Sequence, residues 1–375
     1  MCRYLLILPL TLVALCLAGC RSPRFQSARA MLPPRVKPAA VRPATNIAAV
    51  HPNEVGLIPI LMYHDVGGPA NGRGPRFDLH GWNIRPDTLR KQLELMYAAN
   101  WRPVNMHDAL DASLDVPAGK IPVVLTFDDG RGGQLRYRRD GKMDPNCAVA
   151  IMEEFHKDHP DWPLRGTFFV MPRSKWGPDP FYQEASASKK LHYLIKQGFE
   201  IANHSTSHRL MTRMDAHTLQ WELAECVRGI KKLAPEATMD TFALPYGAAP
   251  KDEGLWPFLL KGQDGPTQYQ NRCMLIAWGG PAYPPAHKRF DVRRLTRIGS
   301  DPGDIERWIK RLKPNRALKP YVSDGDPAFV SVTRSAQKWV NPHQLGTVKL
   351  YVWNDLPSKP AQKVAHLAES KLARP

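Results

Sequence analysis

Short apolar runs alternate with amphipathic helical patterns along most of this 375-residue chain. The runs are typical of buried β-strands, and they cover residues 57–63, 121–127, 166–171, 199–202, 241–244 and 273–278. Helical periodicity is found between and after them, at residues 86–97, 145–156, 189–197, 219–233 and 305–312. Because strands joined through helices usually pair in parallel, this order predicts an α/β fold with a parallel sheet, either open or closed into a barrel.

Side chains suited to catalysis follow directly after several of these predicted strands. They are His64, Asp128, Asp129, His204, His208 and Tyr246. In α/β barrels the chemistry takes place at the C-terminal ends of the strands. We therefore expect these residues to meet in one shared site.

The double Asp and the spaced His pair predict a metal site. Asp128 and Asp129 follow an apolar run, and adjacent residues at a strand end point in different directions. One carboxylate can therefore bind a metal while the other handles a proton. His204 and His208 supply the nitrogen ligands that Zn²⁺ prefers, and three ligands leave an open position for water. The alternative is that Asp-Gly forms an ordinary turn, but the joint occurrence at strand ends favours a hydrolase site.

These segments resemble the polysaccharide deacetylase family (NodB homology, carbohydrate esterase family 4). The first motif is T-F-D-D-G at 126–130, the second H-S-T-S-H at 204–208, and the third A-L-P-Y at 243–246, where R-P-P-Y is usual. The resemblance covers roughly residues 57–300. It implies a distorted (β/α) barrel and a deacetylase that depends on Zn²⁺ or another divalent transition metal.

The resemblance also assigns roles to residues. It implies that Asp128 is the catalytic base and that the backbone N–H of Tyr246 is the oxyanion donor. The metal ligands it implies are Asp129, His204 and His208.

The chain departs from the family pattern around the catalytic base and the general acid. The third-motif Arg, which usually holds the catalytic Asp, is Ala243 here. Asp128 then relies on another cation, such as Arg294 or Arg297, or on none. The usual L-x-H motif, which carries the general-acid His, is missing near the end of the domain. The segment 59–64, P-I-L-M-Y-H, resembles deacetylases of biofilm poly-N-acetylglucosamine, so His64 is a candidate acid; the alternative is a structural hydrogen bond.

Several other features have both a functional and a structural interpretation. Trp278 fits either a sugar subsite or core packing. Asp291 and Arg297 are candidates for the charge network of the site. His156 and His159 resemble a second metal cluster, but they close a helical pattern, and a helix C-terminus favours cationic side chains.

The N-terminus is typical of an exported lipoprotein. Residues 1–19 combine a short positive start with an apolar stretch too short to span a bilayer comfortably, and Leu-Ala-Gly precedes Cys20. We expect Cys20 to be lipidated. Arg21, which follows it, favours the periplasmic side of the outer membrane if the cell is Gram-negative. A Pro-rich basic tether at 20–53 would then hold the chain off the membrane.

The remaining chain is expected to hold a single catalytic domain at 54–314 and a C-terminal extension at 315–375 whose tail is disordered. Without the signal, three cysteines remain, and their apolar surroundings predict buried thiols rather than a disulfide framework: Cys147, Cys226 and Cys273. The formal net charge of +17 suggests nucleic-acid binding, but the export signal argues against it.

The combined prediction is an enzyme of the cell envelope that removes N-acetyl groups from an amino-sugar polysaccharide. The same chemistry serves an O-acetyl esterase, which is the nearest alternative. A glycan-binding lipoprotein without activity is a further alternative, because the third-motif Arg and the usual acid His are lost. The retained metal ligands and Asp128 argue against it.

Overall fold

The computed structural model describes residues 47–67, 81–172 and 180–354. The predicted signal segment, Cys20, most of the tether and the end of the C-terminal extension lie outside these ranges. So does most of the Gly-rich loop that precedes Gly81. None of the helices within the described ranges is long and apolar enough to cross a membrane.

The centre of the fold is an eight-stranded sheet in which every pair of neighbouring strands is parallel. Its path runs β11-β8-β7-β6-β5-β1-β12, and β4 pairs with the first half of β5. The strands are β1 (Ile60–Tyr63), β4 (Trp101–Val104), β5 (Ile121–Phe127), β6 (Thr167–Val170), β7 (Glu200–Asn203), β8 (Phe242–Ala243), β11 (Met274–Leu275) and β12 (Ile298–Gly299).

The sheet curls so that its two end strands approach each other. An isolated parallel bridge joins Leu275 of β11 to Leu295, three residues before β12 begins. Backbone hydrogen bonds from Ile276 to Leu295 and from Leu295 to Met274 support the bridge. The predicted distorted (β/α) barrel is therefore confirmed.

Strand β5 shows how the pleat separates the two sides of this curled sheet. Val123, Leu125 and Phe127 belong to the apolar cluster between sheet and helices, whereas Val124 belongs to the cluster inside the barrel. Side chains alternate along a strand, so Thr126 and Asp128 share the inner side with Val124. The pleat thus directs the first Asp of the motif into the barrel.

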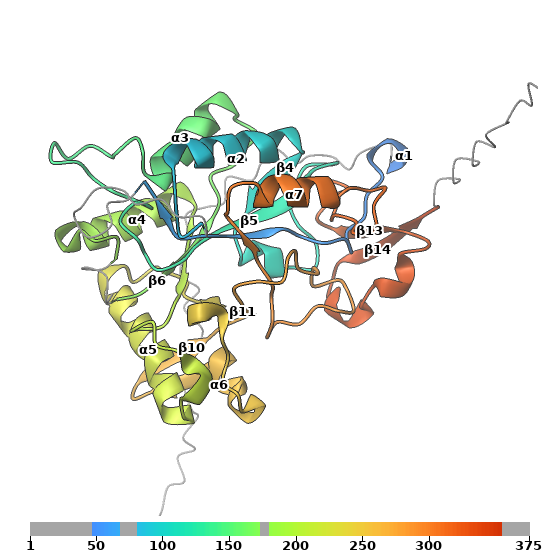
Figure 1. Ribbon diagram of the computed structural model, residues 1–375. Coiled ribbons are helices and arrows are strands. Elements are labelled where there is room, and N and C mark those ends of the chain that lie inside the picture. Colours follow the sequence, from blue (N-terminus) through green and yellow to red (C-terminus); the bar gives the residue numbers. More distant parts are fainter. Residues whose placement is uncertain (1–46, 68–80, 173–179, 355–375) are drawn as a thin grey trace, which may run out of the picture. The chain divides into compact units, whose positions relative to one another are not determined.

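Helices cover the outer side of the sheet. Figure 1 shows α2 (Pro86–Ala98) beside α3 (Ala148–Asp158) and α7 (Asp304–Arg311). Helix α4 (Ala187–Gln197) ends at Gly198, whose left-handed backbone (φ 95°) suits glycine. The long helix α5 (Ala216–Leu233) packs on α4, on β7 and on α6 (Pro257–Leu260). Asp215 caps α5 by accepting a hydrogen bond from the backbone of Thr218.

Smaller strand pairs were not predicted from the sequence, because they lack an apolar run. They are β2 (Asp65–Val66) with β3 (Asn83–Ile84), and β9 (Lys261–Asp264) with β10 (Thr267–Gln270). Near the C-terminus, β13 (Phe329–Thr333) pairs in parallel with β14 (Lys349–Trp353) over a small apolar cluster of its own. A short helix, α1 (Ile47–Val50), precedes the sheet.

The three remaining cysteines are buried free thiols, as predicted.

Candidate active site

A cavity of about 350 Å³ opens at the C-terminal ends of the strands. All six predicted site residues line it: His64, Asp128, Asp129, His204, His208 and Tyr246. The structure therefore brings together side chains that are up to 182 residues apart, because parallel strands deliver their C-terminal ends to the same edge.

Asp128 is held by a guanidinium group inside the barrel. Arg297 Nη1 donates to Asp128 Oδ1 at 2.7 Å, and Nη2 donates to Oδ2 at 2.8 Å. Arg297 Nη1 also donates to Thr126 Oγ1, and its Nε donates to the carbonyl of Ile276. Both side chains of the ion pair are almost fully buried. Of the two cations considered from the sequence, Arg297 is therefore the partner of Asp128.

The surroundings keep the Asp128 carboxylate ionised. Burial alone would raise the pKa of Asp128, but the positive charges of Arg297 and His204 outweigh burial and hold the pKa below its usual range. A carboxylate fixed in this way can accept a proton at neutral pH.

Asp129 points to the His pair on the other side of the motif. Its Oδ1 lies 3.2 Å from His204 Nε2 and 3.2 Å from His208 Nε2. Burial alone would raise the pKa of Asp129, but the neighbouring imidazoles outweigh it and hold the pKa well below the usual range. Sequence neighbours thus have different partners, since Asp128 faces Arg297 and Asp129 faces two imidazoles.

A backbone carbonyl sets the tautomer of His204. His204 Nδ1 lies 2.9 Å from the carbonyl oxygen of Ala243. Because a carbonyl can only accept, Nδ1 must carry a proton, and Nε2, which faces Asp129, is the ring nitrogen available to a metal ion. Ala243, which stands where the family has Arg, thus contributes its backbone to the site.

A buried carboxylate on helix α5 shapes the loop between the two histidines. Glu222 accepts hydrogen bonds from the backbone N–H groups of Thr206 and Ser207, at 3.1 and 3.0 Å, and from the hydroxyl of Ser207. Asn203 accepts from the backbone of Ser205 and donates to the carbonyl of Leu223. Helix α5 therefore holds the loop that presents the histidines.

The three residues fit a divalent metal ion. Their ligand atoms all lie within 4.8 Å of one another, and all three residues are buried. Asp129 Oδ1 and His204 Nε2 make no hydrogen bond in the described structure although both are buried. Two ligands of a tetrahedral ion with bonds of about 2.0–2.1 Å lie roughly 3.3 Å apart, which is close to the observed Asp–His separations. A carboxylate and two imidazoles are also a donor set that Zn²⁺ accepts.

Left-handed backbone conformations gather at this site. Asp129 (φ 73°), Ser205 (φ 66°), His208 (φ 52°) and Tyr246 (φ 58°) all have positive φ, although none is glycine. Such conformations cost about 1–3 kcal/mol each and persist where the surrounding structure enforces them. They turn the chain sharply just after β5, β7 and β8, so the site residues face the cavity.

His64 and two tryptophans form another wall of the cavity. His64 is buried, and its ring lies 4.4 Å from that of Trp82 in an edge-on arrangement. Trp82 in turn lies 6.0 Å from Trp278. Burial lowers the pKa of His64, and the charges of Asp129 and Asp128 oppose this only in part. Trp278 is half exposed and lines the cavity, so it is not a core residue.

Tyr246 lies in the short turn Pro245–Gly247 after β8. Its ring is exposed and meets the ring of His208 at 4.6 Å. The turn therefore lines the cavity beside the His pair.

The structure separates the other sequence candidates from the site. Asp291 pairs with Arg293, and Arg294 lies over the ring of Trp256. His156 Nδ1 bonds to the carbonyl of Trp162 and His159 Nδ1 to that of Phe155. Among the described residues, neither belongs to a group that could hold a metal ion.

Three further residues of the site were missed in the sequence. Arg131 lines the cavity 3.6 Å from Asp129 and directly follows the T-F-D-D-G motif. Glu222 is an acid within the apolar face of α5, which is a detectable signal. Trp82 follows the Gly-rich segment and carries no periodic signal.

A curled parallel (β/α) sheet with a double Asp and two His at its strand ends defines a hydrolase-type site. Residues 115–254 match the family model described as polysaccharide deacetylase. The chain contains a polysaccharide deacetylase domain and is an enzyme of this class. The family implies deacetylation of an acetylated polysaccharide.

Several solved structures are similar to the chain. The Streptococcus pyogenes deacetylase PplD in complex with acetate is 19% identical, with 69% of this chain and 99% of that chain covered and a TM-score of 0.49. The putative polysaccharide deacetylase BA0330 from Bacillus anthracis is 12% identical, with coverages of 65% and 64% and a TM-score of 0.47. IcaB from Ammonifex degensii is 15% identical, with coverages of 68% and 96% and a TM-score of 0.47.

Proposed function

We propose that this enzyme is a metal-dependent N-deacetylase of an amino-sugar polysaccharide of the cell envelope or an exopolysaccharide. One observation carries the proposal. Asp129, His204 and His208 converge in a buried three-ligand cluster, next to a carboxylate, Asp128, that Arg297 fixes through two hydrogen bonds.

The residues of the site divide the reaction between them. A divalent ion held by the cluster would polarise the acetamide carbonyl and activate water as the nucleophile. Asp128 accepts the proton of the attacking water, because its carboxylate is ionised and lines the same cavity. Arg297 prevents Asp128 from turning toward the metal ligands, since both carboxylate oxygens are held.

Other residues that line the cavity are candidates for the remaining roles in the reaction. The backbone N–H of Tyr246, in the turn after β8, is the candidate donor to the developing oxyanion, and such donors contribute about 3 kcal/mol. His64 is the candidate donor of a proton to the leaving amine. Burial lowers the pKa of His64, so its protonated form gives up the proton more readily than an ordinary imidazolium does. Trp82 and Trp278 offer ring faces on which a sugar can stack.

The test is an acetate-release screen of the purified enzyme with peptidoglycan, chitin oligomers, poly-N-acetylglucosamine and acetylxylan. We expect release from N-acetylated substrates, about one divalent ion per chain, and loss of release in Asp128→Asn with the ion retained. Asp129→Ala and His204→Ala should lose the ion. Release from acetylxylan alone would replace the proposal with an O-acetyl esterase. Binding of a glycan without any release would replace it with a glycan-binding protein.

The cellular location is a separate part of the proposal. The apolar segment before Cys20 supports export and lipidation of that residue, which would place the enzyme on the periplasmic side of the outer membrane of a Gram-negative cell. Labelling cells with palmitate tests this. Label in the wild-type chain and its loss in Cys20→Ala is the expected result, and an unlabelled wild-type chain excludes the anchor.

A further inference from the structure

We propose that a second groove binds a saccharide segment that carries carboxylate or phosphate groups. This arginine groove has a volume of about 410 Å³, and its walls include Leu57, Pro281, Tyr283, Arg289, Trp308 and Arg311. It shares no lining residue with the catalytic cavity. The inference goes beyond the proposed function and does not depend on it.

The arginine groove and the catalytic cavity are separated by two chain segments whose neighbouring residues line one or the other of them. Trp278 lines the cavity, whereas the next residue, Gly279, lines the groove. In the adjacent segment Thr296 lines the groove and Arg297 lines the cavity. The backbone of Gly280 donates to the carbonyl of Arg297 and joins the two segments. The groove is therefore a separate site, placed next to the catalytic one.

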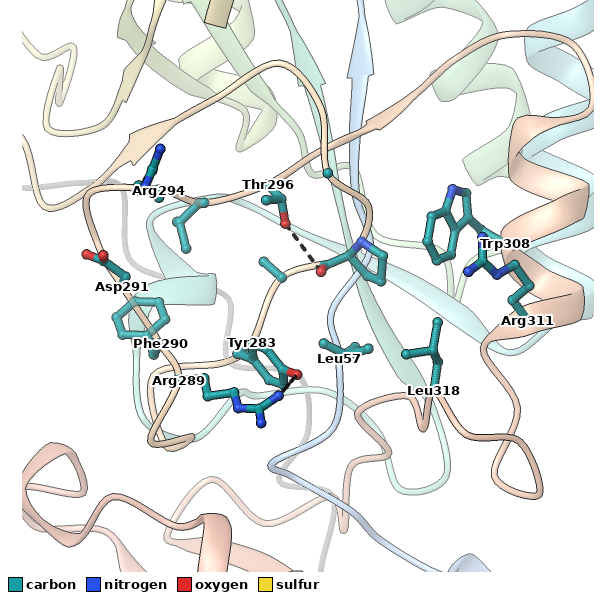
Figure 2. Close-up of a pocket in the computed structure, with 14 residues that line it drawn as sticks. Leu57, Tyr283, Arg289, Phe290, Asp291, Arg294, Thr296, Trp308, Arg311 and Leu318 are labelled. Carbon is teal, nitrogen blue, oxygen red and sulfur yellow. Dashed lines mark hydrogen bonds between the residues drawn. The ribbon is translucent and has the colours of Figure 1, made fainter. Parts of the chain in front are cut away.

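Two arginines face each other across the groove. Figure 2 shows Arg289 beside Tyr283 on one side and Arg311 beside Trp308 on the other. Arg289 Nη1 donates to Tyr283 Oη at 3.1 Å, and its guanidinium carbon lies 4.9 Å from the ring centre of Trp339. The guanidinium carbon of Arg311 lies 4.4 Å from the ring centre of Trp308. An arginine stacked on an aromatic face keeps its N–H edge for planar anions.

The positive charge of the groove is not neutralised by the protein. Among the residues that the structure describes, Arg289 and Arg311 take part in no ion pair. Asp291, the one carboxylate in the described lining, is bound by Arg293. Residues 286–319 contain eleven Lys or Arg against four Asp or Glu. A local excess of this kind attracts anions.

Apolar side chains also line the groove, which favours a sugar over a free inorganic ion. Leu57 and Leu318 lie between the two arginines in Figure 2. The rings of Tyr283 and Trp308 also line the groove and are partly exposed. Apolar contact in the centre and a guanidinium on either side match an acidic saccharide.

Binding of tetragalacturonate to the purified full-length chain tests the inference, with the neutral methyl ester of tetragalacturonate as the matched control. Neither compound carries an acetamido group, so the test is independent of deacetylation. Glucose 6-phosphate against glucose provides the phosphate arm. We expect calorimetry to show binding of an acidic member and at least tenfold weaker binding of its neutral partner. Whichever pair of compounds shows the larger difference in affinity between its acidic and its neutral member identifies carboxylate or phosphate as the preferred anion.

The double variant Arg289→Gln/Arg311→Gln locates the site. It should weaken binding of the acidic compound at least tenfold at constant salt, whereas Arg316→Gln, an exposed arginine outside the groove, should change it less than twofold. If Arg316→Gln weakened binding of the acidic compound as much as the double variant does, the compound would be attracted by the general positive charge of the surface. This result would overturn the inference. Equal binding of acidic and neutral compounds, or no binding of either, overturns it without any variant. Acetate release is expected to stay unchanged in the double variant.

Discussion

Arg297 and Asp128 form a buried ion pair through two hydrogen bonds. Their own strand ends are separated by a third strand of the sheet. Asp128 follows β5, Arg297 precedes β12, and β1 lies between these strands. The third motif, where the family usually has Arg, carries Ala243 here. Arg297, from another part of the sequence, therefore supplies a cation behind the candidate catalytic carboxylate.

We expect Arg297→Ala to shift the pH profile of the enzyme. Without the guanidinium, burial of Asp128 is opposed less, so its pKa rises toward and above the usual range. The base acts in its ionised form, so the acid limb of kcat/KM should move to higher pH, and activity at pH 7 should fall by about 10²–10⁴-fold. Arg294→Ala, which alters a guanidinium outside the site, should keep the wild-type profile. An unmoved acid limb in Arg297→Ala would contradict the role of the pair.

Glu222 is expected to control metal affinity without touching the metal. Removal of its carboxylate in Glu222→Ala leaves two backbone N–H groups of the histidine loop without their acceptor. Loss of such supporting contacts typically weakens metal binding by about 10–100-fold. Titration of the metal-free chain with Zn²⁺ measures this directly. Glu222→Gln keeps one acceptor oxygen and should lie between wild type and Glu222→Ala.

The control for this series lies on the same helix. Glu225→Gln changes a carboxylate of α5 that pairs with Arg228 and does not contact the histidine loop. It should bind Zn²⁺ with wild-type affinity. If Glu222→Ala also binds Zn²⁺ with wild-type affinity, the loop does not need the carboxylate.

His64 can be tested through the leaving group. Expulsion of an amine requires a proton, whereas 4-nitrophenolate leaves without one. His64→Ala should therefore lose about 10²–10⁴-fold of its activity on N-acetylglucosamine oligomers but keep most of its activity on 4-nitrophenyl acetate. Asp128→Asn, which removes the base, should lower both activities. A parallel loss of both activities in His64→Ala would assign this residue to substrate positioning instead of proton donation.

Much of the fold could be predicted because its strands are buried on both faces. The apolar run at 121–127 matches β5 residue for residue. Strand β4 was missed because it contains Arg102 and Pro103, and the buried charge of Arg102 is balanced by Asp161, which is remote in sequence. Strand β12 has only two residues, too few for a periodic signal. The hairpin β9-β10 is largely exposed and polar.

In the site, as in the fold, features set by the local sequence could be predicted, whereas features set by contacts between remote residues could not. Motif spacing predicted which residues meet, because each motif follows its own strand. For the cation that pairs with Asp128, the sequence offered Arg294 and Arg297 as candidates but could not decide between them. Arg297 is 169 residues from Asp128 along the chain, and a single sequence does not show which remote residues lie close in space. The left-handed backbone at Asp129, Ser205 and His208 was not predictable, because none of these residue types requires it.

A buried acidic cluster outside the catalytic cavity predicts how stability depends on pH. Glu54 accepts hydrogen bonds from Tyr321 Oη and from the backbone N–H groups of Asp324 and Ser331. It thereby connects the start of the fold to β13 and to the segment before it. Burial, reinforced by the charge of Asp324, raises the pKa of Glu54 to about 8, although the accepted hydrogen bonds oppose the rise.

The contribution of Glu54 to the stability of the folded chain should therefore fall as pH rises. Between an unfolded pKa of about 4.3 and the folded pKa of about 8, the folded state binds more protons than the unfolded state. The contribution of Glu54 is fully present below this window and is lost above it, with a slope of up to about 1.4 kcal/mol per pH unit.

Urea denaturation from pH 5 to 9 measures the free energy of unfolding. Glu54→Gln cannot ionise, so its curve should be flatter than that of wild type, whereas the exposed Glu253→Gln should retain the wild-type slope. Parallel curves for Glu54→Gln and wild type would show that Glu54 titrates alike in both states.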